Sequence, residues 1–209
     1  MKKAYIFDLD NTIYPVASIA DELFAPLFQL IKNSGSSEKY FDAIKFNIMR
    51  KPFQLVATQY NFSQALIKQA TELLTKLTYA KKMFPYDDYA CVKEIPADHF
   101  LVTTGFINMQ QSKVRQLGIE SDFKEIHIID PTITQQTKKD AFAGIRDKYN
   151  YSAQQMVIIG DDPDSEIKAG NELKMDTVLY DKNNLHPHSK ATYTITDFNK
   201  LFSLFDIIK

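Results

Sequence analysis

The sequence predicts an α/β protein built on a doubly wound parallel sheet, with a small helical bundle inserted after the first strand. Apolar β-forming segments that end in polar residues recur along the chain. From about His99 onward these segments alternate with segments of helical period, which is typical of parallel strands joined by right-handed crossovers. Between Tyr14 and about Pro85 only the helical period is found.

Six segments have the strand pattern. They are "AYIFDL" (4–9), "HFLVTTG" (99–105), "EIHIID" (125–130), "MVIIGDD" (156–162), "DTVLYD" (176–181) and "ATYTI" (191–195). The continuous apolar run "MVIIG" suits a strand that is covered on both faces. In open sheets of this kind, sites form at the carboxyl ends of the strands, which is where Asp8, Thr103 and Asp161 fall.

Residues 14–85 contain apolar side chains at intervals of three and four, as in "ADELFAPLFQLIKN" and "SQALIKQATELLTKL". Ser36 or Ser37 and Ser63 are candidate helix N-caps, and Pro52 should end one helix. We therefore expect an α/β core made of residues 1–13 and 86–209 and a helical cap domain made of residues 14–85, joined by two hinges.

The composition is that of an ordinary globular protein, with 44% apolar and 24% charged residues. A net charge of −1 argues against an extended nucleic-acid surface. The single cysteine, Cys91, cannot form an intramolecular disulfide, so a reducing interior such as the cytoplasm is expected. No apolar run approaches the roughly 20 residues of a membrane span, so we expect no membrane segment.

Two carboxylates, Asp8 and Asp10, stand where the first strand ends. Such a pair can hold a divalent cation, pair with cations, or divide the roles of nucleophile and general acid or base. A solvated turn acid followed by an N-cap is the simpler alternative. The pair alone therefore does not decide between chemistry and local structure.

A second acidic group follows the strand "MVIIG", where "GDDPDSE" places four acids within six residues. These charges repel one another unless they are solvated or neutralised by a metal ion. A helix N-terminus explains Asp164 and Glu166, because Pro163 suits a first helical position and acids there favour the helix dipole. It does not explain Asp161, which lies between the strand and that helix.

Hydroxyl and lysine side chains complete the candidate set. In "LVTTGF", Thr103 and Thr104 precede a helical segment, where hydroxyls and amides can bind phosphate oxygens or act as a plain N-cap. In "TQQTKKDAF", Lys138 and Lys139 begin a helix, where a cation opposes the dipole. Either lysine could serve a distant anion or lie at a solvated surface.

Together, "FDLDNT", "LVTTG", "TKKDAF" and "GDDPDSE" resemble the four sequence blocks of the haloacid dehalogenase-like (HAD) superfamily, specifically its phosphatases. The resemblance covers the whole chain, because the helical segment falls where members with a cap after the first block carry a helical bundle. It implies a Rossmannoid core. "DLDNTIYP" is similar to the pyrimidine 5'-nucleotidase-like branch.

The resemblance implies phosphoryl transfer through an aspartyl-phosphate. Asp8 would be the nucleophile, and Asp10 would protonate the leaving alcohol and then activate water. Thr103 and Thr104 would bind the phosphoryl oxygens, and Lys138 would offset their negative charge. Thr104 stands where asparagine is frequent in the family, so its phosphate contact is expected to differ.

The resemblance also implies a Mg²⁺ site formed by the carboxylates of Asp8 and Asp161 and the main-chain carbonyl of Asp10. Glu166 stands in place of an aspartate. Its longer side chain suits holding a metal-bound water or the active-site lysine better than direct coordination.

The choice of Lys138 rests on a recurrent family spacing, a lysine four residues before a phenylalanine, here Phe142. Lys139 stays the alternative. Dehalogenases of the superfamily lack an aspartate equivalent to Asp10, because a halide leaves without a proton, so Asp10 favours a phosphate ester. We expect a small phosphorylated metabolite as substrate, such as a nucleotide or a sugar phosphate. The alternatives are a dehalogenase-type hydrolase and a receiver-like or degenerate phosphate-binding protein.

Overall fold

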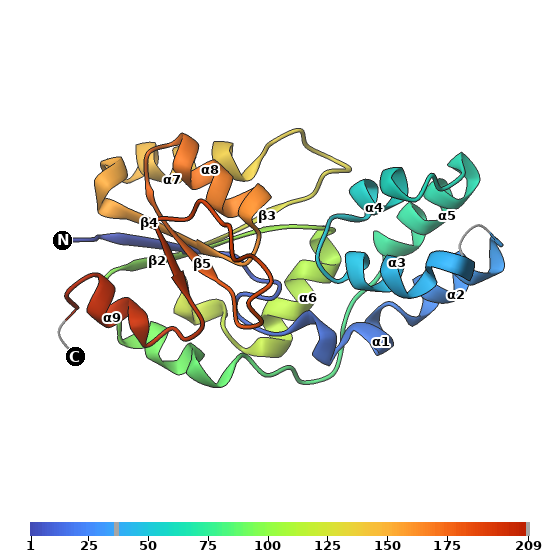
Figure 1. Cartoon of the computed structure of the whole chain (residues 1–209), viewed down its shortest axis with the longest axis horizontal. Helices are drawn as coiled ribbons and strands as arrows, with labels where there is room; N and C mark the ends of the chain where they lie inside the picture. Colours follow the sequence, from blue (N-terminus) through green and yellow to red (C-terminus); the bar gives the residue numbers. More distant parts are fainter. Residues whose placement is uncertain (36–37, 208–209) are drawn as a thin grey trace.

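The computed structural model describes residues 1–35 and 38–207. In this part of the chain the six expected strands form one parallel sheet of order β3-β2-β1-β4-β5-β6 (Figure 1). The strands are Ala4–Phe7 (β1), Asp98–Thr104 (β2), Glu125–Ile129 (β3), Met156–Gly160 (β4), Asp176–Tyr180 (β5) and Tyr193–Ile195 (β6). The doubly wound α/β prediction is confirmed, and β1 lies in the middle of the sheet between β2 and β4.

Helices cover both faces of the sheet. Figure 1 shows α7 and α8 on one face and α9 on the other. The core helices are α6 (Ile107–Leu117), α7 (Lys138–Lys148), α8 (Lys168–Glu172) and α9 (Lys200–Leu204). Short 3₁₀ segments run over Asp87–Glu94, Glu120–Asp122 and Ala153–Gln155, and a π-helical turn covers Pro163–Ile167 just before α8.

The segment between β1 and β2 is helical, as expected, and it lies beyond the carboxyl ends of the strands (Figure 1). It contains α1 (Ala20–Leu23), α2 (Ala25–Asn33), α3 (Phe41–Ile48), α4 (Phe53–Gln59) and α5 (Gln64–Leu74), with 3₁₀ turns at Val16–Ser18 and Glu38–Tyr40. Ser63 caps α5 by accepting a bond from the Leu66 N–H at 3.2 Å, and Pro52 precedes α4. The candidate caps Ser36 and Ser37 lie outside the described residues.

The sheet separates two apolar layers, because alternate residues of each strand point to opposite faces. Ile6, Val102 and Ile158 pack against α7 and α8 on one face. Tyr5, Phe7 and the residues beside them pack on the other face, in a layer that continues into the interior of the helical segment. The two parts therefore share apolar contacts, and the proposed boundaries at residues 13/14 and 85/86 stay a prediction.

The two connections between the sheet and the helical segment lie against each other. The Tyr86 N–H donates a hydrogen bond of 2.8 Å to the Ile13 carbonyl. Within the described residues, no helix is long and apolar enough to cross a membrane.

Candidate active site

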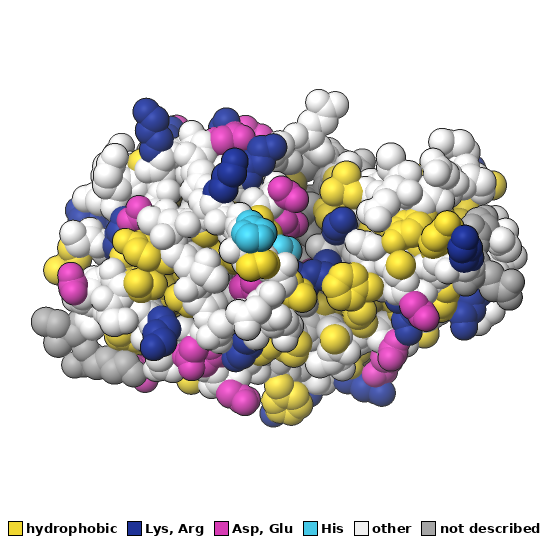
Figure 2. Space-filling view, in the orientation of Figure 1, with side chains coloured by type: hydrophobic (Ala, Val, Ile, Leu, Met, Phe, Trp, Pro, Cys, Tyr) yellow, Lys and Arg dark blue, Asp and Glu magenta, His cyan; other side chains and the backbone are white. Residues whose placement is uncertain are grey.

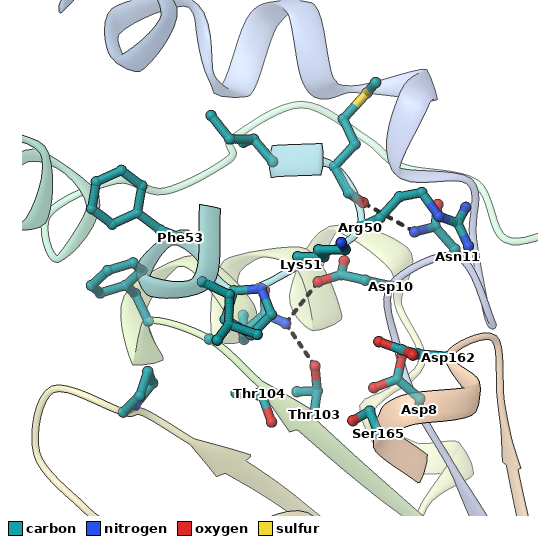
Figure 3. Close-up of a pocket in the computed structure, with 18 of the residues that line it drawn as sticks. Asp8, Asp10, Asn11, Arg50, Lys51, Phe53, Thr103, Thr104, Asp162 and Ser165 are labelled. Carbon is teal, nitrogen blue, oxygen red and sulfur yellow. Dashed lines mark hydrogen bonds between the residues drawn. The ribbon is translucent and has the colours of Figure 1, made fainter. Parts of the chain in front are cut away.

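A cavity of about 300 Å³ lies between the carboxyl ends of the strands and the helical segment. Figure 2 shows acidic and basic side chains beside hydrophobic ones where these two parts meet. All six residues predicted from the sequence line the cavity: Asp8, Asp10, Thr103, Thr104, Lys138 and Asp161. The structure thus brings together groups that are spread over most of the chain (Figure 3).

Asp8 follows β1 directly, and its N–H donates to the Ile159 carbonyl of β4 at 2.9 Å. This bond continues the parallel ladder and directs the buried carboxylate into the cavity. Lys138 donates a bond of 2.5 Å to Asp8 and also pairs with Glu166. Burial alone would lower the pKa of Lys138, but the charges of Asp8 and Glu166 raise it, so the lysine is a firmly held cation.

The two neighbouring lysines have different partners because of the point at which α7 begins. The Thr137 side chain accepts from the Asp140 N–H, and Asp140 accepts from the Thr137 N–H, which forms a capping box. Lys138 is then the first helical residue and points inward, whereas Lys139 pairs with Glu172 at the surface at 2.8 Å. The structure therefore brings Lys138, rather than Lys139, to Asp8.

Glu166 reaches Lys138 because Gly160 leaves room for it. A Cβ atom at Gly160 would lie 2.6 Å from the Glu166 Cγ and 2.7 Å from its Oε2. The second oxygen of Glu166 accepts from the Asp162 N–H at 3.2 Å. Of the two roles the sequence left open for Glu166, the structure shows the contact with the lysine.

Asp161, at the end of β4, is buried and accepts a bond of 2.9 Å from Arg50, which follows α3. Burial, together with the charges of Glu166 and Asp8, raises the pKa of Asp161 well above its usual range, and Arg50 opposes this rise. Burial likewise raises the pKa of Asp8 to about 7, despite the opposing charge of Lys138. The two carboxylates thus lie in a site whose own cations do not fully neutralise it.

Carboxylates that are only partly neutralised are suited to binding a cation. Among the described residues, no three His, Cys, Asp or Glu side chains form a complete metal site. A Mg²⁺ site does not need three such side chains, since the ion commonly binds one or two carboxylates and fills its remaining coordination positions with water and substrate oxygens. The carboxylates of Asp8 and Asp161 fit that requirement.

Asp10 lies in a dense hydrogen-bond network. Tyr14 donates to its Oδ1 at 2.5 Å, Lys113 donates to both oxygens at 2.9 and 3.0 Å, and Gln110 donates to Oδ2 at 3.0 Å. Burial alone would raise the pKa of Asp10, but the charge of Lys113 and these hydrogen bonds lower it. In this substrate-free arrangement Asp10 is therefore held as a carboxylate.

The hydroxyls of β2 are not helix caps, because α6 begins after Phe106 and the Ile107 N–H donates to Asp130 at 3.0 Å. Thr103 is buried, and its Oγ1 accepts from Gln110 at 2.7 Å. Thr104 lines the cavity beside it. The plain N-cap alternative for these threonines is thus wrong.

Residues 2–174 match the family of haloacid dehalogenase-like hydrolases. The chain belongs to this family. Its sequence is 26% identical to a glyceraldehyde 3-phosphate phosphatase of Methanopyrus kandleri, and the match covers 85% of this chain and 83% of the relative. It is 25% identical to the pyrimidine 5'-nucleotidase PynA of Streptococcus pneumoniae, over only 52% of this chain and 47% of the relative.

Solved structures of haloacid dehalogenase-like proteins share the whole fold. A family protein of Streptococcus pneumoniae superposes with a TM-score of 0.75 and 15% identity, covering 98% of both chains. The hydrolase YfnB of Bacillus subtilis, bound to magnesium, gives 0.67 and 19%, covering 99% of both chains. An L-2-haloacid dehalogenase of Xanthobacter autotrophicus gives 0.61 and 12%, covering 100% of both chains.

Two residues of this haloacid dehalogenase-like site, Gln110 and Lys113, are missed by reasoning from the sequence. Both lie on the buried stripe of α6 between the apolar residues Phe106 and Leu117. Polar side chains at positions where a helix should be apolar are the signal that could have found them.

Proposed function

We propose that the protein is a Mg²⁺-dependent phosphatase that hydrolyses a small phosphomonoester through an aspartyl-phosphate. The observation that carries the proposal is the buried Asp8 carboxylate, bonded to Lys138, in the same cavity as Asp10. This reaction needs a nucleophile, a cation that binds the transferred group and a group that transfers a proton, for which Asp8, Lys138 and Asp10 are the candidates.

In the first step, Asp8 attacks phosphorus, an Asp8 oxygen–phosphorus bond forms and the bond to the leaving oxygen breaks. Asp10, which binds a proton before this step, gives that proton to the leaving oxygen and becomes a carboxylate. In the second step, water attacks phosphorus while Asp10 takes its proton, and Asp8 is released with inorganic phosphate. Lys138 and the hydroxyls of Thr103 and Thr104 would bind the phosphoryl oxygens throughout.

Asp8 and Asp161, with the main-chain carbonyl of Asp10, would hold Mg²⁺. When bound, the ion would supply positive charge that lets the Asp8 carboxylate and a phosphate group share one cavity. The raised pKa values of Asp8 and Asp161 support this role, because burial and the neighbouring carboxylates raise them more than Lys138 and Arg50 lower them.

We further propose that residues 14–85 act as a cap that selects the leaving group. The cavity wall formed by this segment is mostly apolar, with Phe24, Leu27, Ile48 and Phe53 near Arg50. A phosphatase of glyceraldehyde 3-phosphate and a pyrimidine nucleotidase among the relatives support a sugar phosphate or a nucleotide as substrate. The cytoplasmic location stays a prediction.

Dehalogenation is the second candidate, because solved haloacid dehalogenases share this fold. Asp10 speaks against it, since a departing halide needs no proton and the chain nevertheless places a multiply hydrogen-bonded carboxylate at this position. Membership of a hydrolase family counts against a receiver-like role.

The test is phosphate release from a panel of nucleotides, sugar phosphates and p-nitrophenyl phosphate, with and without Mg²⁺. We expect hydrolysis that requires Mg²⁺ and is abolished in Asp8→Asn, while the exposed control Asp147→Asn keeps it. Phosphate release by Asp8→Asn at the wild-type rate, or halide release from a 2-haloacid instead of phosphate release, would contradict the proposal.

A further inference from the structure

One face of α6 sends two side chains to Asp10. Lys113 is 2% exposed and Gln110 is 1% exposed. Lys113 donates to both oxygens of the Asp10 carboxylate, at 2.9 and 3.0 Å. Neither residue belongs to the four sequence blocks that predicted the site.

Burial of the Lys113 ammonium group is energetically costly. An ammonium group that leaves water loses its hydration, and only a charged partner with good geometry compensates for this loss. Asp10 is the ion-pair partner that the structure shows for Lys113 among the described residues, and the Tyr14 ring lies 5.9 Å from the ammonium nitrogen. The buried lysine is therefore placed to pair with the Asp10 carboxylate and to compensate its charge.

Gln110 joins two parts of the site. Its amide nitrogen donates to Asp10 Oδ2 at 3.0 Å and to Thr103 Oγ1 at 2.7 Å, which are the two dashed lines that meet at one nitrogen in Figure 3. Gly105 leaves room for the Gln110 side chain, because a Cβ atom there would make a tight contact of 3.1 Å with the Gln110 Cγ and Cδ. The amide thus fixes the spacing between Asp10 and Thr103.

We propose that Lys113 and Gln110 are positioning residues for phosphoryl transfer. Lys113 fixes the direction of the Asp10 carboxylate, and Gln110 keeps it at a set distance from the hydroxyl that binds the phosphoryl group. Lys113 acts through Asp10, and Gln110 acts through Asp10 and Thr103. The inference rests on the proposed phosphatase activity.

The proposal predicts a dependence on the leaving group. An alkyl alkoxide must be protonated as it departs, whereas p-nitrophenolate is stable enough to leave without a proton. A misplaced Asp10 should therefore slow formation of the aspartyl-phosphate from an alkyl phosphate much more than from p-nitrophenyl phosphate. The ratio kcat/KM reports this step alone, because hydrolysis of the shared intermediate follows it. A general loss of structure would slow both alike.

The experiment compares kcat/KM for p-nitrophenyl phosphate and for the alkyl phosphate that the wild type hydrolyses fastest. We expect Lys113→Met and Gln110→Ala to lower kcat/KM for the alkyl substrate by about 10²-fold and for the aryl substrate by less than about fivefold. Arg115→Met and Gln111→Ala, exposed on the same helix, are matched controls that should keep wild-type values.

A double-variant cycle completes the test. In the Asp10→Asn background, adding Lys113→Met should cause no further loss for the alkyl substrate, because both changes act on the same proton transfer. Equal losses of kcat/KM on both substrates, or losses that multiply in the double variant, would overturn the proposal. If Lys113→Met does not fold, Gln110→Ala, which removes no buried charge, decides alone. A wild type that hydrolyses neither substrate would instead refute the proposed function and, with it, this inference.

Discussion

Arg50, next to the end of α3, donates a hydrogen bond of 2.9 Å to Asp161 at the end of β4. Their side chains are 19% and 12% exposed, so solvent screens the pair only partly. The bond joins the helical segment to a carboxylate that we propose as a ligand of Mg²⁺. Contact with the helical segment and the proposed binding of the ion would therefore use the same group.

Arg50→Ala should raise the affinity for Mg²⁺, because it removes a cation that competes for Asp161. A partly buried, charged hydrogen bond of about 1 kcal/mol corresponds to about a fivefold gain. Isothermal titration calorimetry of the substrate-free protein measures it, with the exposed neighbour Lys51→Ala as control. Equal effects of the two changes, or weaker binding by Arg50→Ala, would contradict the competition.

Lys138→Met should lower kcat by about 10²- to 10³-fold, the usual cost of losing a charge that stabilises a transition state. Lys139→Met should stay close to wild type, since its partner Glu172 lies at the surface. Steady-state hydrolysis of p-nitrophenyl phosphate by both variants is the measurement. If Lys139→Met were the inactive one, the assignment of the active-site lysine would be reversed.

Gly160→Ala should impair both stability and activity. Its new Cβ atom would lie 2.6 Å from the Glu166 Cγ, so Glu166 and its partner Lys138 must move. Overpacking of this kind costs about 1–3 kcal/mol. Gly144→Ala on α7 is the control, because its new Cβ atom would lie in open space. This change should raise the free energy of unfolding by about 0.5–1 kcal/mol. Chemical denaturation and kcat, measured on both, would show whether the two glycines differ in this way.

Burial lowers the pKa of His99 below its ordinary 6.5, against the opposing charges of Asp122 and Asp98. Its Nε2 has no hydrogen-bond partner among the described residues. Below pH 6.5 the His99 imidazole binds a proton in the unfolded chain but not in the folded chain. The contribution of His99 to the stability of the fold is therefore complete above pH 6.5. It falls as the pH drops from 6.5 toward the pKa of His99 in the folded chain.

The measurement is thermal unfolding between about pH 5 and 8. The stability of the wild type should fall toward acid more steeply than that of His99→Phe, which fits the neighbouring rings of Tyr5 and Phe7. The exposed His188→Gln serves as control. Parallel profiles for wild type and His99→Phe would show that this imidazole does not carry the effect.

The fold was predictable because its determinants are local. A strand such as "MVIIG" is apolar throughout since both of its faces are covered, and it ends where acids begin. The helical segment shows its period equally clearly. Its division from the core at residues 13/14 and 85/86 stays a prediction, because apolar contacts continue across it.

The site was only partly predictable, because some of its contacts depend on tertiary structure. Lys113 meets Asp10 across 103 positions, and Arg50 meets Asp161 across 111 positions, so no local pattern indicates either pair. The choice between Lys138 and Lys139 depends on the residue at which α7 begins, which shifts the direction of a side chain by about 100° per residue. In the structure the capping box of Thr137 makes Lys138 the first helical residue and brings it to Asp8.

The bond between the Tyr86 N–H and the Ile13 carbonyl places the two ends of the helical segment side by side. When the two ends of an inserted segment lie side by side, the sheet can carry segments of very different length. The reason is that the entropic cost of closing a loop depends only weakly on the number of residues in it. The sheet with its acids could therefore accept inserts of quite different size at this position, and exchange of the insert would change which molecules enter while the chemistry beneath stays the same.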